Sequence, residues 1–138
     1  MLRCFLPSVI SNSSIPECEV IVADNGSQDA SADVVSKMPS VRWMPLGQNY
    51  GFAEGYNRAI EQVESDYVVL LNSDVEVTKG WLTTLLSYMD AHPHTAACQP
   101  KIKKESQRSY FEHAGAAGGY IDIFGYPYCR GRILDQVE

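Results

Sequence analysis

Two short apolar runs constrain the fold of this chain more than any other feature of its sequence. Residues 20–23 and residues 67–71 are almost purely aliphatic, with one tyrosine at the start of the second run. Continuous aliphatic and β-branched runs of this length are typical of strands that are buried on both faces, as in a parallel sheet. Residues 41–46 and 95–99 show weaker patterns of the same kind, so we expect four strands.

Helical patterns lie before and between these strands. Apolar residues recur with helical spacing at residues 2–12, 31–38, 52–64 and 81–92, and Ser31 is placed to cap the second of these helices. The alternation of helices and strands predicts an α/β fold, with a mostly parallel sheet and helices on both of its faces. The total of 138 residues suits one domain.

Composition argues against nucleic acid as a partner and against a secreted or membrane-spanning chain. The chain has 17 acidic and 11 basic residues and a formal net charge of −6, so nucleic acid is not an expected partner. The four cysteines are scattered without metal-ligand spacing, which favours reduced thiols in a cytoplasmic protein. Apolar stretches are too short to span a bilayer, and the N-terminal residues do not read as a signal peptide.

Polar residues follow both apolar runs directly. The first run is followed by Asp24-Asn25-Gly26-Ser27 and the second by Asn72-Ser73-Asp74. In an open α/β sheet, ligands bind at the carboxyl ends of the strands, so both groups are expected on one edge. A carboxylate there suits a hard divalent cation, which prefers oxygen ligands. The plainer alternatives are a tight turn for the first group and a helix-capping loop for the second.

A third segment, residues 49–57, joins a strand to a helix and contains two glycines and two asparagines. Glycine permits close approach of the backbone to a ligand, and the helix beyond offers free N–H groups to an anion. On its own, this spacing of glycines is weak evidence for a binding site.

Taken together and in this order, the three segments resemble the family 2 glycosyltransferases, which are inverting enzymes of the GT-A fold. The similarity covers about residues 2–90 and is greatest to the rhamnosyltransferase-like branch. It implies transfer of a sugar from a UDP- or dTDP-sugar to a saccharide or lipid-linked acceptor, in polysaccharide or glycoconjugate synthesis. It also implies a Mg²⁺ or Mn²⁺ ion at Asp74. The residues that it assigns to nucleotide binding are Asp24, Asn25, Gly26, Ser27, Asn49, Gly51, Asn57, Asn72 and Ser73.

The sequence departs from the family pattern at two positions. Asn72 stands where the family's metal-binding motif begins with Asp, which lowers the negative charge beside Asp74. Tyr56 stands where many relatives carry Arg, which removes one expected cationic contact to the diphosphate.

The resemblance also implies that the chain is truncated at both ends. A strand of the family precedes the first helix, and the acidic general base is expected beyond Glu138, so this fragment is expected to be inactive alone. Residues 1–100 would form the nucleotide-sugar-binding half, and residues 101–138 would begin the acceptor-side region. The second part contains several basic residues, among them Arg130 and Arg132. These residues would either contact a phosphate group, on the donor, a lipid acceptor or the membrane, or they would belong to solvated loops. Peripheral contact with the inner face of the membrane is therefore an expectation.

Two other functions fit parts of the pattern. A non-catalytic nucleotide-sugar-binding module would keep the same three segments and lack the downstream acid. A sugar-phosphate nucleotidyltransferase has a similar fold, but residues 24–27 of this chain disfavour it.

Overall fold

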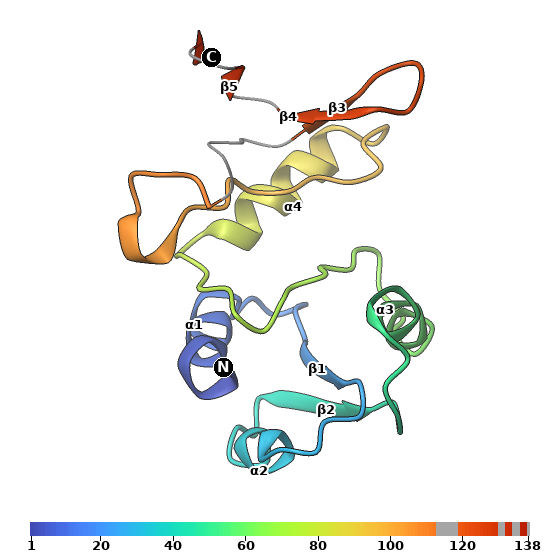
Figure 1. Ribbon diagram of the computed structural model, residues 1–138. Coiled ribbons are helices and arrows are strands. Elements are labelled where there is room, and N and C mark those ends of the chain that lie inside the picture. Colours follow the sequence, from blue (N-terminus) through green and yellow to red (C-terminus); the bar gives the residue numbers. More distant parts are fainter. Residues whose placement is uncertain (113–118, 130–131, 134–135, 138) are drawn as a thin grey trace. The chain divides into compact units, whose positions relative to one another are not determined.

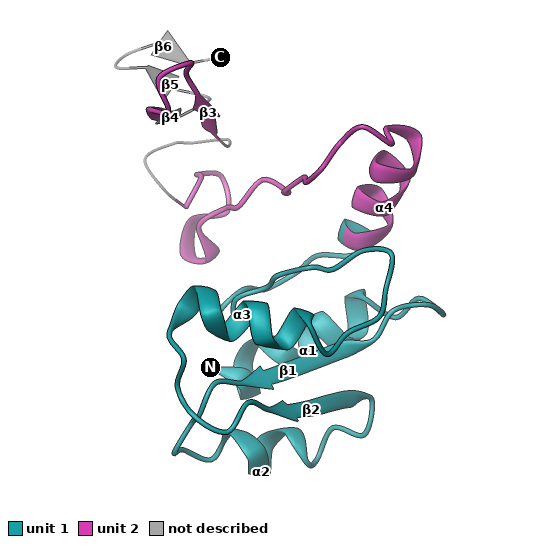
Figure 2. Ribbon diagram, turned by 90° about the vertical axis from the view of Figure 1, so that its right-hand side faces the viewer, with its two compact units in different colours: residues 1–81 teal, residues 82–138 magenta. Residues whose placement is uncertain are grey.

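The computed structural model describes residues 1–112, 119–129, 132–133 and 136–137. It divides into two compact units, residues 1–81 and residues 82–138, which Figure 2 shows in different colours. The expected division at residue 100 is one of function, and it stays a prediction.

The first unit is built on two parallel strands, β1 (Val20–Asp24) and β2 (Val41–Pro45). Their register pairs Val20 with Val41 and Asp24 with Pro45. The backbone N–H of Leu46 then donates to the carbonyl of Asp24 at 2.9 Å, which carries the pairing to the end of β1. The predicted strands at residues 20–23 and 41–46 and their parallel arrangement are confirmed.

Three helices cover this pair of strands. Figure 1 shows α3 (Phe52–Ile60) on one side of the strands, and α1 (Leu2–Asn12) and α2 (Ser31–Val35) on the other. Helices on both faces of a parallel sheet confirm the predicted α/β class, here in incomplete form. The helix α2 is shorter than predicted, and Ser31 is its first residue rather than its cap. The Asp29 carboxylate accepts from the Ser31 N–H at 2.9 Å instead.

The buried apolar side chains of this unit come from several elements. They are Leu6 of α1, Val34 and Val35 of α2, Met44 of β2, and Val77. Polar groups on α1 then fix the segment around Val77, because Asn12 Nδ2 donates to the Val77 carbonyl at 3.0 Å and Ser8 Oγ accepts from the Val77 N–H at 3.3 Å. The N-terminal helix is thus fastened to a segment about 65 residues further along the chain.

The prediction of a strand at residues 67–71 was wrong. These residues pair with no other strand among the described residues, and Val68, Val69 and Leu70 are 45%, 47% and 54% exposed. Apolar composition gives a segment the tendency to be buried, but a strand also needs a neighbour for its N–H and C=O groups. Residues 95–99, expected as a further strand, likewise form none.

The second unit contains α4 (Trp81–Ala91), whose first residue belongs to the first unit, and it confirms the helix expected there. A short 3₁₀ turn, η1 (Glu105–Gln107), follows. Two antiparallel pairs lie beyond it: β3 (Gly119–Ile121) with β4 (Pro127–Cys129), and β5 (Arg132–Ile133) with β6 (Gln136–Val137). In the described part of the chain, no helix is both long and apolar enough to cross a membrane.

Candidate functional site

The chain turns sharply at the end of β1. Asp24 Oδ1 accepts from the backbone N–H of Ser27 at 3.0 Å, and Gly26 has a positive φ of 81°. This is the tight turn that the residues predict as their plainer interpretation. One carboxylate oxygen of Asp24 is engaged in the turn, and the other can accept a hydrogen bond from a ligand.

The turn after β1 touches the loop after β2 at Gly26. A Cβ atom added to Gly26 would lie 2.6 Å from both the backbone nitrogen of Asn49 and the backbone carbonyl carbon of Gln48. Real Cβ atoms do not approach backbone so closely. Glycine is therefore required here for the close approach of two loops as well as for the turn.

The side chain of Asn25 joins the same two loops. Its Nδ2 donates to the Gly51 carbonyl at 2.8 Å and to Asn49 Oδ1 at 3.3 Å, while its Oδ1 accepts from the Tyr50 N–H at 2.9 Å. Asn49 Oδ1 also accepts from the N–H of Gly51, two residues on, at 2.8 Å. Two of the predicted motifs are thus hydrogen-bonded to each other.

The helix α3 begins directly after this loop, and its Gly55 lies against the side chain of Asn25. Gly51 precedes it with φ of 78°, and Gly55 is buried in its first turns. A Cβ atom on Gly55 would lie 2.8 Å from Asn25 Nδ2. Glycine inside a helix costs about 0.5–1 kcal/mol relative to alanine, so this position has a specific reason to lack a side chain. The sequence suggested approach to a ligand, whereas the structure places the Asn25 amide there.

The next residue of α3 reaches the third motif. The Tyr56 hydroxyl donates to Asn72 Oδ1 at 3.3 Å, and Ser73 and Asp74 form an exposed turn beyond Asn72. Consecutive residues of α3 therefore contact the loop after β1 and the loop that carries Asp74. Asn57 is exposed on α3, and no hydrogen bond of the described residues links its side chain to the other candidates.

The positively charged side chain of Arg58 lies beside the loop at residues 49–51. The sequence motifs did not identify this residue. The Arg58 guanidinium carbon lies 4.0 Å from the centroid of the Tyr50 ring, and Arg58 Nε lies 2.8 Å from Glu54 Oε1. The pairing with Glu54 follows from the spacing of four residues on a helix, but the contact with Tyr50 depends on the path of the loop.

The residues present fit a divalent cation only in part. Within the described residues there is no group of three or more His, Cys, Asp or Glu side chains that could hold a metal ion. Asp74 supplies one exposed carboxylate. Mg²⁺ is often held by one or two carboxylates together with phosphate oxygens of the substrate, so a single acid is compatible with a cation that binds along with a diphosphate.

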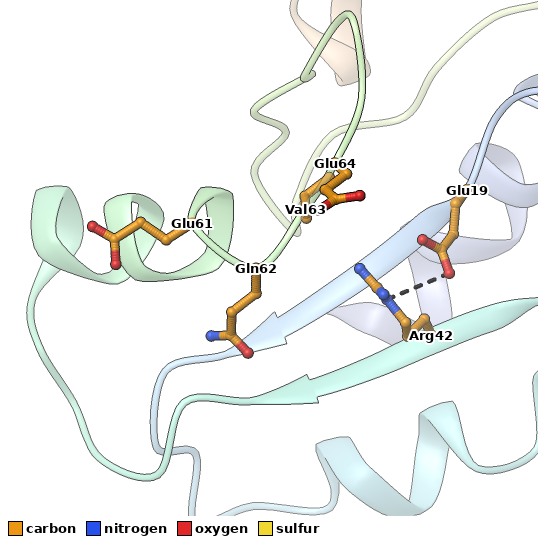
Figure 3. A pocket seen from close by; sticks show the side chains of 6 residues that line it. All are labelled: Glu19, Arg42, Glu61, Gln62, Val63 and Glu64. Carbon is orange, nitrogen blue, oxygen red and sulfur yellow. Dashed lines mark ion pairs between the residues drawn. The ribbon is translucent and has the colours of Figure 1, made fainter.

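A cavity lies at the opposite ends of the strands. It measures about 400 Å³ and is lined by residues at the start of β1 and β2 and after α3. Figure 3 shows Glu19 paired with Arg42, at 3.4 Å, while Glu61 points away from this ion pair. The acidic side chains do not converge there, so this cavity is a poor cation site. Its lining residues are Glu19, Arg42, Glu61, Gln62, Val63 and Glu64.

Asp29, which lies shortly after the turn at the end of β1, has a shifted pKa. The pKa of Asp29 is lowered, first by the hydrogen bond from the Ser31 side chain and then by the Ser31 backbone N–H. Arg130, which was expected either to meet a phosphate or to belong to a solvated loop, lies outside the described residues.

The three motifs that α3 connects belong to a chain whose sequence is similar to those of known proteins. Residues 1–134 match the family described as glycosyl transferase family 2. The chain belongs to this family. It is 32% identical over 114 residues to the N-acetylglucosaminyl-diphospho-decaprenol L-rhamnosyltransferase of Mycobacterium tuberculosis, with 74% of this chain and 37% of the relative covered.

A second relative is less similar to this chain. The poly-β-1,6-N-acetyl-D-glucosamine synthase of Staphylococcus epidermidis is 27% identical over 106 residues, with 73% of this chain and 26% of the relative covered. The chain thus spans little more than a third of the length of the curated relatives that it matches first. No solved structure matches the chain.

Proposed function

We propose that this chain is the donor-binding part of a glycosyltransferase. The reaction transfers a sugar from a UDP- or dTDP-sugar to an acceptor hydroxyl, with inversion at the anomeric carbon. The observation that carries the proposal is the convergence on α3: Gly55 packs against Asn25 of the first motif, and Tyr56 donates to Asn72 of the third. Family membership supplies the reaction class.

Each candidate has a role in this proposal. Asp24 contacts the base or ribose through the carboxylate oxygen that the turn leaves free. The backbone around Gly26, Ser27 and Gly51 shapes the nucleotide pocket, and Asn57, Asn72 and Ser73 line its further side.

Asp74 is the residue that would hold Mg²⁺ or Mn²⁺ beside the diphosphate. The cation offsets negative charge on the departing diphosphate. Its binding depends on the donor's phosphates, because the chain offers one carboxylate and the neighbouring Asn72 oxygen already accepts from Tyr56.

The acceptor is proposed as a saccharide or a lipid-linked saccharide, used in polysaccharide or glycoconjugate synthesis. The Mycobacterium relative supports the lipid-linked form, since its name describes rhamnosyl transfer to a diphospho-decaprenol-linked sugar. Peripheral contact with the membrane would follow from such an acceptor. The general base is proposed to lie in a later block of the family, so the 138 residues would bind the donor without transferring the sugar.

The test is titration calorimetry of UDP and dTDP with and without Mn²⁺. The expected result is a wild-type affinity that rises with the metal. Asp74→Ala should remove most of that rise, and Asp24→Ala should weaken binding equally in both conditions. Loss of one hydrogen bond to a charged group costs about 1.5–3 kcal/mol, or roughly ten- to a hundredfold in affinity.

Asp66→Ala is the matched control, because Asp66 is an exposed carboxylate of the same unit outside the three motifs. It should leave both affinities unchanged. An Asp74→Ala protein that still binds UDP or dTDP more tightly with Mn²⁺ would remove Asp74 from the metal site. Absence of nucleotide binding by the wild-type chain would contradict the proposal as a whole.

A further inference from the structure

The side chain of Asn25 uses both ends of its amide within the protein. Both hydrogens of the Nδ2 group are engaged, by the Gly51 carbonyl at 2.8 Å and by Asn49 Oδ1 at 3.3 Å. The Oδ1 atom accepts from the Tyr50 N–H at 2.9 Å. A side chain whose donors are both satisfied by the protein has none left for a ligand.

The oxygen of Asn49 is committed in the same way. Asn49 Oδ1 accepts from the Gly51 N–H at 2.8 Å as well as from Asn25. The Gly51 carbonyl in turn accepts both from Asn25 and from the Gly55 N–H, at 3.3 Å, which is the first hydrogen bond of α3. The two asparagines therefore tie the end of β1 to the start of α3.

Gly55 completes this arrangement. A Cβ atom there would meet Asn25 Nδ2 at 2.8 Å, Cγ at 3.1 Å and Oδ1 at 3.3 Å, so the whole amide group lies against the helix backbone. Alanine is the better helix former, and its methyl group would displace the amide. The amide is not the far end of a long side chain and has little freedom to retreat.

We infer that Asn25 is a positioning residue, that Asn49 is its partner in this role, and that Gly55 is glycine because the Asn25 amide occupies the space of its Cβ. This inference rests on the proposed nucleotide site, to which the Asn25–Asn49 pair contributes by fixing the loop at residues 49–51 against Asp24. The pair acts on ligands through the position of that loop, not through contact with them.

The first test is a double-mutant cycle with Asn25→Ala, Gly55→Ala and the double variant. Amide hydrogen exchange at Tyr50 and Gly51 is measured without nucleotide, together with the affinity for UDP and dTDP. Each single variant should lose protection at these amides and about tenfold in affinity, the loss expected from one broken hydrogen bond. The double variant should be no weaker than Asn25→Ala, because without the amide the new methyl group has room. Losses that multiply in the double variant would overturn the inference for Gly55.

The second test separates positioning from contact at Asn49. Asn49→Asp keeps an oxygen that accepts both hydrogen bonds and loses only the Nδ2 donor, whereas Asn49→Ala loses the acceptor. Uridine and thymidine serve as probes, since they carry no phosphate for the new charge to repel. Asn49→Asp should keep the protection of the Gly51 amide and the wild-type affinity, and Asn49→Ala should lose both. Retained protection with lost affinity in Asn49→Asp would overturn the inference by making Asn49 a direct contact.

The exchange measurement also distinguishes this inference from the proposed function. A wild-type chain that protects Tyr50 and Gly51 but binds no nucleotide would contradict the proposed function and leave the hydrogen-bonded pair in place. Nucleotide binding without any protection of these two amides would overturn the inference alone.

Discussion

Asp24 Oδ1 lies 3.0 Å from the backbone nitrogen of Ser27, so the carboxylate proposed to contact the nucleotide also closes the turn after β1. The turn and the ligand would use different oxygens of one group. A substitution at Asp24 therefore has two separable effects, one on the fold and one on binding.

Asp24→Asn and Asp24→Ala should separate these effects. Asn keeps an oxygen for the Ser27 N–H and should change the free energy of unfolding by less than about 0.5 kcal/mol, whereas Ala loses the bond and should cost about 1 kcal/mol. Both should weaken binding of UDP or dTDP. Urea unfolding and calorimetry on the two variants give the comparison. Equal stability of the two variants would mean that the turn does not depend on this hydrogen bond.

Gly26→Ala should be far more destabilising than Gly47→Ala. Both positions have positive φ, of 81° and 94°, and this conformation alone costs a non-glycine residue about 1–2 kcal/mol. A Cβ at Gly47 has no atom within 4 Å, whereas one at Gly26 meets backbone at 2.6 Å. The backbone collision should add about 1–3 kcal/mol at Gly26. Thermal unfolding of both variants checks the difference, and equal losses would show that the two loops separate easily.

The sequence predicted those parts of the fold that depend on local pattern. The strands at β1 and β2, the helices α1, α3 and α4, and the turn at Asp24 all follow from apolar spacing or turn chemistry. Residues 67–71 were wrongly expected as a strand, because a strand also depends on a neighbour that the pattern of one segment cannot show.

For the candidate site, the sequence predicted the residues but not the contacts between them. The motifs identified Asn25, Asn49 and Asn72. The hydrogen bond between Asn25 and Asn49, and the one between Tyr56 and Asn72, depend on how the loops approach in space. The sequence suggested that the glycine at residue 55 allows close approach to a ligand, whereas the structure places against it the side chain of an asparagine 30 positions earlier in the chain. Such a contact can be recognised from sequence only if the two positions are already known to meet.

Ser13→Ala should destabilise the first unit by about 1–2 kcal/mol. Ser13 is the buried polar residue at the end of α1, and its Oγ accepts from Trp81 Nε1 at 3.2 Å. Without Oγ the indole N–H loses its partner in a partly buried place. Ser14→Ala is the matched control, because Ser14 is exposed, and it should change little. In the background of Trp81→Phe, Ser13→Ala should lose most of its effect; an unchanged effect would contradict a role for this hydrogen bond.

The contribution of Asp29 to stability should depend on pH in acid. Its pKa in the folded chain is lowered from the ordinary value of 3.8, so the charged form is favoured by folding. That stabilisation is present above pH 3.8 and is lost as the pH falls through the lower folded value. Asp29→Asn should therefore be less stable than the wild type at pH 6, with a gap that narrows below pH 3.8. Thermal midpoints of both proteins across this range test it, and a constant gap would contradict the sign.

The exposed run at residues 67–71 has a consequence for how this polypeptide behaves in concentrated solution. Tyr67, Val68, Val69 and Leu70 are each between 41% and 54% exposed, and they form a β-prone, uncharged stretch. Stretches of this kind pair with copies of themselves and seed cross-β aggregates unless another segment covers them. Self-association of the 138-residue chain should thus begin at these residues, and a lysine at Val69 would act as a gatekeeper against it.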